Sequence, residues 1–450
     1  MHLSRRAVLS TGAASAGLAA AAASAGPREA AIPADPSGLV LAPSDSSDHT
    51  AALQAAIDQA AAQRVPLRLA PGTFDVGPIA IRPHTCLIGA ARQTVLSFTG
   101  GASFLAAQAA PGVRLEGLVI DGNGLAIDAG RAMGLLALTD CTDVWIGGLE
   151  IRRGLLNGIM LQRASGRVTD CMLHDLAEAG VVSLDAEGLT IAHNAVADCG
   201  NNGIQVWRSA PGEDGTLIVG NRITNIAAKG GGSGQNGNGI NVFRARGVTV
   251  SDNHIADCAY SAVRGNAAGN IQMVGNQCRT LGEVALYAEF AFEGAVIANN
   301  LVDGAASGIA VTNFSEGGRL AVVQGNLVRN LFRREAEPVD KRGVGISIEA
   351  DAAVTGNVIE NAPTAGIIAG WGPYLRDVAI TGNVIRSAGV GILVSADPTA
   401  GACLVSQNMI SGARDGAIRG MDHGVPVGPD LALATAPAVG RHSIAGNLAV

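Results

Sequence analysis

The sequence predicts an all-β protein, a right-handed parallel β-helix in which many short coils stack around one core behind a short N-terminal helix. Glycine supplies 61 of the 450 residues and hydrophobic residues make up 48% of the chain. A short phrase with a central asparagine returns ten times. Each period holds two or three runs of Val and Ile separated by Gly, Asn or Asp, which is typical of short strands and tight turns. Units of this size that recur along a chain stack into a solenoid.

The repeated phrase has the form of Thr381-Gly382-Asn383-Val384-Ile385. Consecutive copies lie 23 to 39 residues apart, which is one coil with insertions of variable length. Asparagine tolerates left-handed backbone angles, and its amide both donates and accepts hydrogen bonds. Because stacked strands lie about 4.8 Å apart, we expect the repeated asparagines to form an internal ladder. These asparagines are Asn194, Asn221, Asn253, Asn276, Asn300, Asn326, Asn357, Asn383, Asn408 and Asn447.

Charge and composition limit the classes of partner. The net charge is −7, charged residues make up 15% of the chain and aromatic residues only 3%. A nucleic-acid surface needs basic patches and stacking aromatics, so we expect no nucleic-acid partner. After the N-terminal region, no run approaches the roughly 20 apolar residues that cross a bilayer, and we expect no membrane span in the mature protein.

The N-terminus resembles a twin-arginine signal peptide. Arg5 and Arg6 precede a weakly apolar run rich in Ala and Gly, and Ala23-Ser24-Ala25 has the form of a signal peptidase site. We therefore expect a signal peptide over residues 1–26, a linker over 27–47 and the β-helix over 48–450. The expected location is the periplasm or the extracellular space, with the twin-arginine export machinery as a partner.

The seven cysteines are an odd number, so at least one has no partner within the chain. Cys199 and Cys258 occupy equivalent places five residues after a repeated asparagine, with the coil of Asn221 between them. Two coils correspond to about 9.6 Å, which exceeds the Cα separation of roughly 7 Å that a disulfide tolerates. We expect small, buried, unbridged thiols.

An outward-facing surface follows from the strand that closes each coil. In Gly203-Ile204-Gln205-Val206-Trp207, alternation sends Gln205 and Trp207 outward. On the following coils the outward residues are Asn241 and Phe243, Arg264 and Asn266, Tyr287 and Glu289, Thr312, and Ser347 and Glu349. Insertions at Lys229–Asn238 and Phe332–Arg342 lie on the same edge and are expected to wall a groove four coils wide.

The middle of this surface combines a cation, a phenol and a carboxylate. We expect Arg264, Tyr287 and Glu289 to be catalytic, while the predicted substrate-binding residues are Gln205, Trp207, Asn241, Phe243, Asn266, Thr312 and Glu349. Opposite charges on neighbouring strands are also ordinary cross-strand pairs. A register in which Ser261 or Ala262 takes the place of the glycine would turn Arg264 inward.

A second signal lies before the repeats. Thr50 to Ala60 has apolar residues at helical spacing, and Leu67-Arg68-Leu69-Ala70-Pro71-Gly72-Thr73-Phe74 follows as a strand and turn. With the arginine pair and the Gly-Asn coils, these segments resemble a family of twin-arginine-translocated, uncharacterised repeat proteins related to pectate-lyase-like β-helices. The resemblance implies that the helix caps the first coil. Its fold hosts polysaccharide lyases, glycoside hydrolases, epimerases and binding or adhesive proteins.

The chain departs from the catalytic motifs of those enzymes. It has no Asp-Asp pair of the polygalacturonase type, no Asp-Pro-His of alginate epimerases and no Arg-x-Pro-x-x-Arg of pectate lyases. Trp145-Ile146 is followed by Gly147-Gly148, where pectate lyases continue with Asp-His. These departures leave the presence of an enzymatic activity open.

Three functions remain as hypotheses, all with a polysaccharide as partner. In lyase-type β-elimination on an acidic polymer, Arg264 neutralises the substrate carboxylate and Tyr287 abstracts a proton or protonates the leaving oxygen. Glu289 or Glu349 then orients the arginine or holds a calcium ion, and no other cofactor is expected. An inverting glycoside hydrolase using Glu289 and Glu349, which lie two coils apart, is the first alternative. A non-catalytic carbohydrate-binding or surface protein is the second.

Overall fold

The computed structural model describes residues 38–128, 133–334, 343–433 and 441–450, and Gly38–Val450 is one compact unit. The expected signal peptide lies outside the described residues, as does the first part of the expected linker. The rest of that linker contains β1 (Leu39–Leu41), which pairs in parallel with β2 (Leu67–Leu69). The compact unit therefore begins ahead of residue 48, because Leu39 and its neighbours add a strand to the first sheet.

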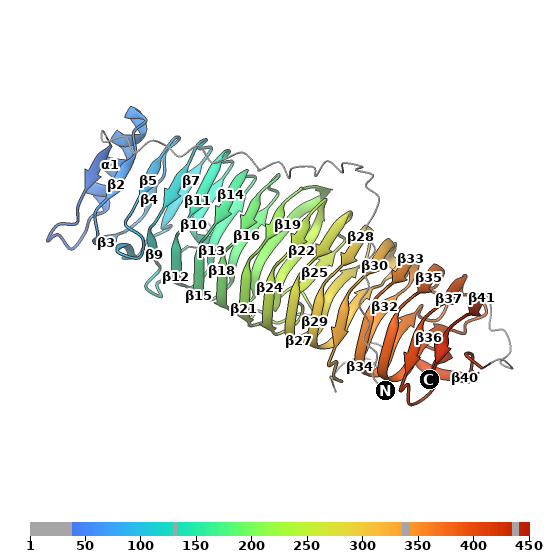
Figure 1. The fold of residues 1–450 in the computed structure, drawn as a ribbon. Helices are drawn as coiled ribbons and strands as arrows, with labels where there is room; N and C mark the ends of the chain where they lie inside the picture. Colours follow the sequence, from blue (N-terminus) through green and yellow to red (C-terminus); the bar gives the residue numbers. More distant parts are fainter. Residues whose placement is uncertain (1–37, 129–132, 335–342, 434–440) are drawn as a thin grey trace, which may run out of the picture. The chain divides into compact units, whose positions relative to one another are not determined.

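The chain from Gly38 onward is a stack of coils, as Figure 1 shows by the regular change of colour from one strand to the next. Within the described residues the strands form a 16-stranded and a 26-stranded sheet. Strands one coil apart pair in parallel, and the pairing of β39 with β40 is antiparallel. The predicted parallel β-helix is confirmed.

The first sheet contains β1 (Leu39–Leu41), β2 (Leu67–Leu69), β5 (Cys86–Ile88), β8 (Arg114–Glu116), β11 (Val144–Gly147), β14 (Gly166–Thr169), β17 (Thr190–Ala192), β20 (Leu217–Val219), β23 (Thr249–Ser251), β26 (Ile271–Val274), β28 (Glu293–Ala298), β30 (Arg319–Gln324), β33 (Ala350–Thr355), β35 (Arg376–Thr381), β37 (Cys403–Ser406) and β41 (His442–Ala445). The second sheet contains β3 (Gly72–Val76), β4 (Ile79–Ala80), β6 (Thr94–Phe98), β7 (Leu105–Gln108), β9 (Val119–Asp121), β10 (Gly134–Thr139), β12 (Glu150–Gly154), β13 (Asn157–Gln162), β15 (Met172–Leu176), β16 (Ala179–Leu184), β18 (Ala195–Cys199), β19 (Asn202–Glu213), β21 (Arg222–Ile226), β22 (Asn238–Arg246), β24 (His254–Cys258), β25 (Val263–Asn266), β27 (Gln277–Glu289), β29 (Leu301–Val311), β31 (Leu327–Arg329), β32 (Val344–Ile348), β34 (Val358–Ala369), β36 (Val384–Ser395), β38 (Met409–Ser411), β39 (Ile418–Asp422), β40 (Val425–Asp430) and β42 (Leu448–Ala449).

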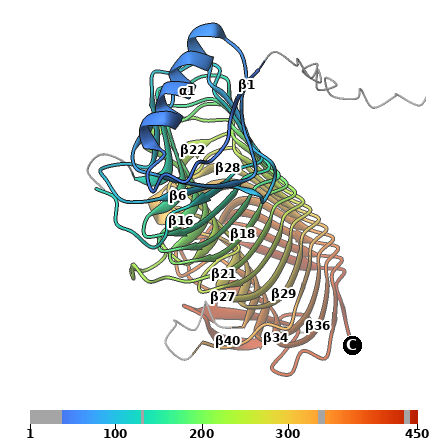
Figure 2. The same ribbon diagram turned by 90° about the vertical axis from the view of Figure 1, so that its left-hand side faces the viewer.

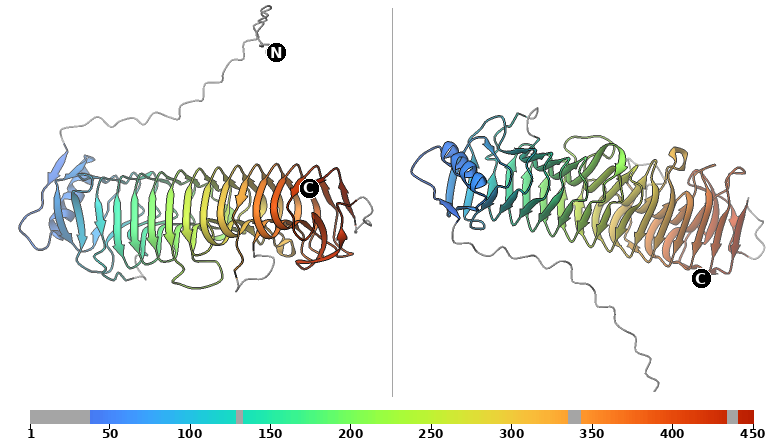
Figure 3. Two further views of the ribbon diagram at one scale, coloured as in Figure 1. Left: turned by 60° about the horizontal axis from the view of Figure 1, so that its bottom comes forward. Right: turned by 90° about the horizontal axis from the view of Figure 1, so that it is seen from above.

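The repeated asparagines form the predicted ladder at the turn after each strand of the first sheet from β17 onward, beginning at Asn194. The side-chain Nδ2 of Asn357 donates to Oδ1 of Asn383 at 2.9 Å, and Nδ2 of Asn383 donates to Oδ1 of Asn408 at the same distance. The backbone N–H of each of these asparagines donates to the same oxygen of the next one. In the left view of Figure 3 one edge of the stack is a regular row of turns, and longer loops project from the opposite edge.

The left-handed backbone at this turn belongs to the residue before the ladder asparagine, which corrects our expectation. Gly382 has φ 65°, and His193 and Asp252 have φ 58° and 56° at the equivalent position, while the ladder asparagines themselves keep negative φ. Glycine recurs before the asparagine because it adopts positive φ without steric cost. The asparagine is selected instead for its buried, doubly hydrogen-bonded amide.

The helix α1 (Thr50–Gln63) extends three residues beyond the predicted Ala60 and ends at Arg64, which has φ 55°. Its apolar side chains Leu53 and Ile57 are fully buried. The helix contacts β1, β2, β4 and β5, and Figure 2 shows it in front of the first coils with the stack receding behind it. A second helical segment, the 3₁₀ turn η1 (Phe314–Glu316), follows β29.

All seven cysteines are unbridged, as predicted. In the strand register Cys199 lies beside Ile226, and Ile226 lies beside Cys258, so one full coil separates the two thiols. Burial raises the pKa of Cys171 and of Cys199 to about 12. The thiols are small core side chains that resist ionisation.

Among the described residues, no helix has the length and apolar character needed to cross a bilayer.

Candidate functional site

The predicted outward residues line up in two columns on the second sheet. In the first column Gln205 lies beside Asn241, Asn241 beside Arg264, and Arg264 beside Tyr287. In the second column Trp207, Phe243, Asn266 and Glu289 lie side by side in that order. Thr312 and Glu349 continue the second column, because they follow the paired residues Val311 and Ile348. The Arg264 coil therefore keeps the outward register, with no slip.

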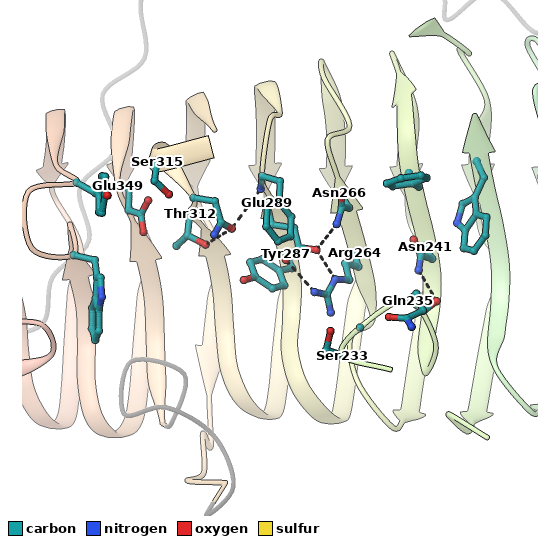
Figure 4. A pocket seen from close by; sticks show the side chains of 17 residues that line it. Ser233, Gln235, Asn241, Arg264, Asn266, Tyr287, Glu289, Thr312, Ser315 and Glu349 are labelled. Carbon is teal, nitrogen blue, oxygen red and sulfur yellow. Dashed lines mark hydrogen bonds and ion pairs between the residues drawn. The ribbon is translucent and has the colours of Figure 1, made fainter. Parts of the chain in front are cut away.

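A cleft of about 700 Å³ lies over these columns. It is lined by Trp207, Ser233, Gly234, Gln235, Asn241, Phe243, Arg264, Asn266, Tyr287, Glu289, Phe290, Thr312, Asn313, Ser315, Glu349, Trp371 and Tyr374. Figure 4 shows their side chains on one face of adjacent strands, with the segment of Ser233 and Gln235 beside Arg264. All the predicted site residues line the cleft except Gln205, which is buried at the start of the first column.

The predicted triad is buried on the floor of the cleft, where we expected solvent exposure. Arg264 is 7% exposed, Tyr287 5% and Glu289 1%. Arg264 Nε donates to Glu289 Oε1 at 2.7 Å and Nη2 donates to Glu289 Oε2 at 3.0 Å, a two-pronged pair. Asn266 Nδ2 donates to the same carboxylate at 2.9 Å. The arginine and glutamate lie deep because loops and neighbouring coils cover the outer face here.

A second carboxylate, Glu283, completes the charge cluster. Arg264 Nη1 donates to Glu283 Oε2 at 3.2 Å, and Glu283 is only 3% exposed. Sequence reasoning missed this residue, because it precedes the regular part of the strand at a shift of register between Leu281 and Val284. Alternation along the strand gives no signal for Glu283, because the shift interrupts the period of two and Val284 packs in the same cluster as Tyr287.

The loop at Lys229–Asn238 forms a wall of the cleft, as predicted. Gly234 lies so close to Arg264 that a Cβ there would collide with the guanidinium, and its φ is 139°. The carbonyl of Gln235 accepts hydrogen bonds from Nδ2 of Asn202 and of Asn241, both at 3.0 Å. These bonds fix the glycine-rich loop against the strands that it covers.

The second expected wall, Phe332–Arg342, lies partly outside the described residues, and its described residues Phe332 to Arg334 do not line the cleft. Among the described residues, the opposite wall is formed by Asn313 and Ser315 near η1, and by Trp371 and Tyr374 in the turn after β34. These two aromatics lie in a Trp-Gly-Pro-Tyr segment, a turn signal that sequence reasoning did not connect to the groove.

Aromatic side chains stand at both ends of the cleft. Trp207 and Phe243 contact each other edge to face, with ring centroids 6.0 Å apart and an interplanar angle of 68°. Trp371 and Tyr374 lie at the other end, in the turn after β34, one coil beyond Glu349. Tyr287, predicted to be catalytic, lies beside Arg264, whose Cζ is 5.1 Å from the ring centroid.

Burial and charge set the protonation of the floor. Burial raises the pKa of Tyr287 strongly, and the Glu289 carboxylate raises it further, so the phenol keeps its proton. Burial by itself lowers the pKa of Arg264, but its ion pairs with Glu289 and Glu283 outweigh this effect and raise the pKa.

Farther along the cleft, Glu349 Oε2 accepts a hydrogen bond of 2.6 Å from the backbone N–H of Phe314.

A metal site does not emerge from this arrangement. Across the described ranges, no three or more His, Cys, Asp or Glu side chains are grouped so that they could hold a metal ion. Calcium therefore has no set of carboxylate ligands in the described part of the cleft.

The fold and the cleft define a parallel β-solenoid with one walled face. The family model described as "Right handed beta helix region" matches residues 157–327 and 212–385, which together span just over half of the chain. The chain belongs to this right-handed β-helix family.

Several solved structures are similar to this chain. A double mutant of the tailspike protein of E. coli bacteriophage HK620, in complex with a pentasaccharide, is similar with a TM-score of 0.52 and 13% identity, covering 87% of this chain and 77% of the tailspike chain. The N-terminal fragment of gene product 12 of bacteriophage Phi29 is similar with a TM-score of 0.51 and 16% identity, covering 83% and 67%. The A-module of a mannuronan C-5 epimerase from Azotobacter vinelandii is similar with a TM-score of 0.39 and 15% identity, covering 89% and 96%. No curated protein matches the sequence.

Proposed function

We propose that the cleft binds a saccharide chain. The observation that carries the proposal is the pairing of aromatic side chains at both ends with a polar floor between them. Trp207 and Glu349 lie five coils apart in one column, which corresponds to about 24 Å. Sugar rings stack on aromatic faces, and amides and hydroxyls satisfy the sugar hydroxyls between them.

The volume and the fold agree with this proposal. Pockets that bind small molecules range from about 300 to 1,000 Å³, and the cleft of about 700 Å³ falls within this range. The HK620 tailspike holds a pentasaccharide on the same kind of solenoid. That likeness concerns the fold, so the saccharide proposal for this chain depends on the residues of its own cleft.

The lyase hypothesis has less support than binding. β-Elimination on an acidic polymer requires Arg264 to meet a substrate carboxylate, but Glu289 and Glu283 already occupy the guanidinium. The raised pKa of Tyr287 keeps the phenol protonated, so it is not available as a base, and it also makes the phenol a weaker proton donor. Glu289 and Glu349 lie two coils apart, about 9.6 Å between backbones, which leaves inverting hydrolysis as the catalytic alternative. Glu289 is a poor general acid there because its carboxylate is paired with Arg264.

A glycan array followed by calorimetry tests the proposal. Trp207→Ala and Trp371→Ala are each expected to weaken saccharide binding about tenfold, equivalent to about 1.4 kcal/mol. Trp145→Ala is the matched control, because this tryptophan packs under Arg114 on the first sheet, away from the cleft lining. Ultraviolet absorbance of unsaturated products and release of reducing ends report lyase and hydrolase activity in the same samples. Absence of binding to every glycan would refute the proposal.

Export by the twin-arginine pathway to the periplasm or beyond is also proposed, on the arginine pair and the Ala-Ser-Ala site near residue 25. Changing Arg5 and Arg6 together to lysine is expected to retain the precursor in the cytoplasm, as measured by cell fractionation. Normal export of that variant would contradict this proposal.

We further propose that α1 closes the N-terminal end of the hydrophobic core, because Leu53 and Ile57 are fully buried against the first strands. Leu53→Asp is expected to unfold the first coils, seen as rapid amide exchange from β2 to β6. Unchanged exchange in those strands would show that the helix does not protect them.

A further inference from the structure

The charged groups of the cleft are mostly carboxylates. Among the residues that the structure describes, its lining contains one cation, Arg264, and two carboxylates, Glu289 and Glu349. Glu283 adds a third carboxylate behind the floor, in contact with Arg264. Because these groups lie in a partly enclosed space where water screens poorly, their field acts on any ligand that enters.

The one cation is already engaged by the protein. Its Nε and Nη2 donate to Glu289, and its Nη1 donates to Glu283. Tyr287 lies against the guanidinium, and the backbone at Gly234 packs onto it. A carboxylate from a ligand would have to displace a buried, two-pronged ion pair to reach Arg264, and removing one partner of such a pair is strongly unfavourable.

Two arginines next to the cleft, Arg244 and Arg376, are held by other partners. Arg244 lies over the Phe243 ring at 4.6 Å and donates from Nη1 to the carbonyl of Ser209. Arg376 lies over a ring as well, that of Phe314, and pairs with Asp351. Neither arginine lines the cleft.

The remaining polar lining is uncharged. It consists of the amide side chains Gln235, Asn241, Asn266 and Asn313 and the hydroxyl side chains Ser233, Thr312 and Ser315. Amides and hydroxyls donate and accept, which matches sugar hydroxyls and acetamido groups. They provide no positive charge that would offset the carboxylates.

We infer that the cleft is selective for uncharged saccharides and rejects uronate polymers, because in its described lining the carboxylates outnumber the one arginine, which is paired with the protein's own glutamates. This inference rests on the proposed saccharide binding and names the chemical class of ligand for the same site. It departs from the acidic polymer that the sequence favoured, because the sequence does not reveal that Arg264 is sequestered.

Matched pairs of oligosaccharides test the inference on the full chain. Each pair has the same backbone in uronate and neutral form: galacturonate with its methyl ester, glucuronate with glucose, and mannuronate with mannose oligomers. Binding is measured by calorimetry at low salt and again at high salt. For every backbone that binds, the neutral form is expected to have a dissociation constant at least about tenfold lower than the uronate form. High salt is expected to bring the two dissociation constants closer together, because it screens charge.

A variant pair isolates the cause. Glu349→Gln keeps an acceptor for the N–H of Phe314 and removes one charge, so it is expected to reduce the preference for the neutral member by at least about threefold. Glu187→Gln, at an exposed position that does not line the cleft, is expected to leave the preference unchanged.

The outcomes separate the two proposals. Tighter binding of a uronate than of its neutral counterpart overturns the inference and leaves saccharide binding intact. An unchanged preference in Glu349→Gln also overturns the inference, because the discrimination would then not come from the cleft charge. Failure of every oligosaccharide of the panel and of the glycan array to bind overturns the proposed function itself.

Discussion

Replacing one asparagine of the ladder tests whether these amides hold the coils together. Asn276 Nδ2 donates to Asn300 Oδ1 and to the carbonyl of Val250, both at 3.0 Å. Its Oδ1 accepts from the backbone N–H of Asn253 at 3.1 Å and from Asn253 Nδ2 at 3.0 Å. Asn276→Ala removes all four bonds and leaves the Asn253 N–H and the Val250 carbonyl without these partners in the interior. At about 1 to 3 kcal/mol for each such group, the loss of unfolding free energy is about 2 to 6 kcal/mol.

Urea denaturation followed by circular dichroism measures this loss. Gln108→Ala is the control, because Gln108 is exposed and its side chain donates one bond, to Asp140 Oδ2 at 2.7 Å. Its effect should stay within about 0.5 kcal/mol. A loss below about 1 kcal/mol for Asn276→Ala, or equal losses for both variants, would refute the structural role of the ladder. Amide exchange should accelerate first in the coils of Asn253 and Asn300.

Three further predictions concern buried ionisable groups. Glu289→Gln leaves Arg264 with one carboxylate and should lower the free energy of unfolding, measured by urea denaturation, by about 3 to 5 kcal/mol. Glu283→Gln should lower it less, because the single contact of Glu283 with the arginine is longer. A larger loss for Glu283→Gln would contradict the geometry. Cys171, whose pKa burial raises to about 12, should react with a thiol reagent at pH near 8 only after unfolding, and fast labelling of the native protein would count against its burial. Burial raises the pKa of Asp214, against the opposing effect of its hydrogen bond from Thr216. The folded carboxyl therefore keeps its proton to higher pH than the unfolded one, so its stabilising contribution is present below the unfolded pKa and is lost as pH rises through the folded pKa. Asp214→Asn should reduce the fall of the unfolding free energy with rising pH, measured by denaturation at a series of pH values. An unchanged slope of unfolding free energy against pH would contradict this prediction.

The repeat and its register could be read from the sequence because they depend on local chemistry. A turn that needs a left-handed residue and a buried amide admits few residue types, so the asparagine recurs in ten coils and six of the ten copies have Gly before it. Once the period is known, alternation along a strand fixes which side chains point outward, and Asn241, Arg264 and Tyr287 fall in one column as predicted. The same reasoning predicted that Cys199 and Cys258, with one coil between them, are too far apart for a disulfide.

The state of the site residues could not be read in this way. The alternating pattern puts Arg264 on the outer face, but the burial of Arg264 depends on the path of the glycine-rich loop at Gly234. It also depends on Glu283, which contacts the guanidinium and lies in the segment where the strand register shifts. Trp371 enters the cleft from a turn after the strand, where no periodic rule applies.

The sequence by itself determined the solenoid, its ladder and the face that carries the cleft, because each follows from a short-range preference repeated at a fixed period. Only the tertiary structure decided which outward side chains are covered, which carboxylates pair with Arg264 and which aromatics form the far wall. Those features depend on where irregular loops pack against neighbouring coils, and the free energy of that packing belongs to many residues distant in the chain.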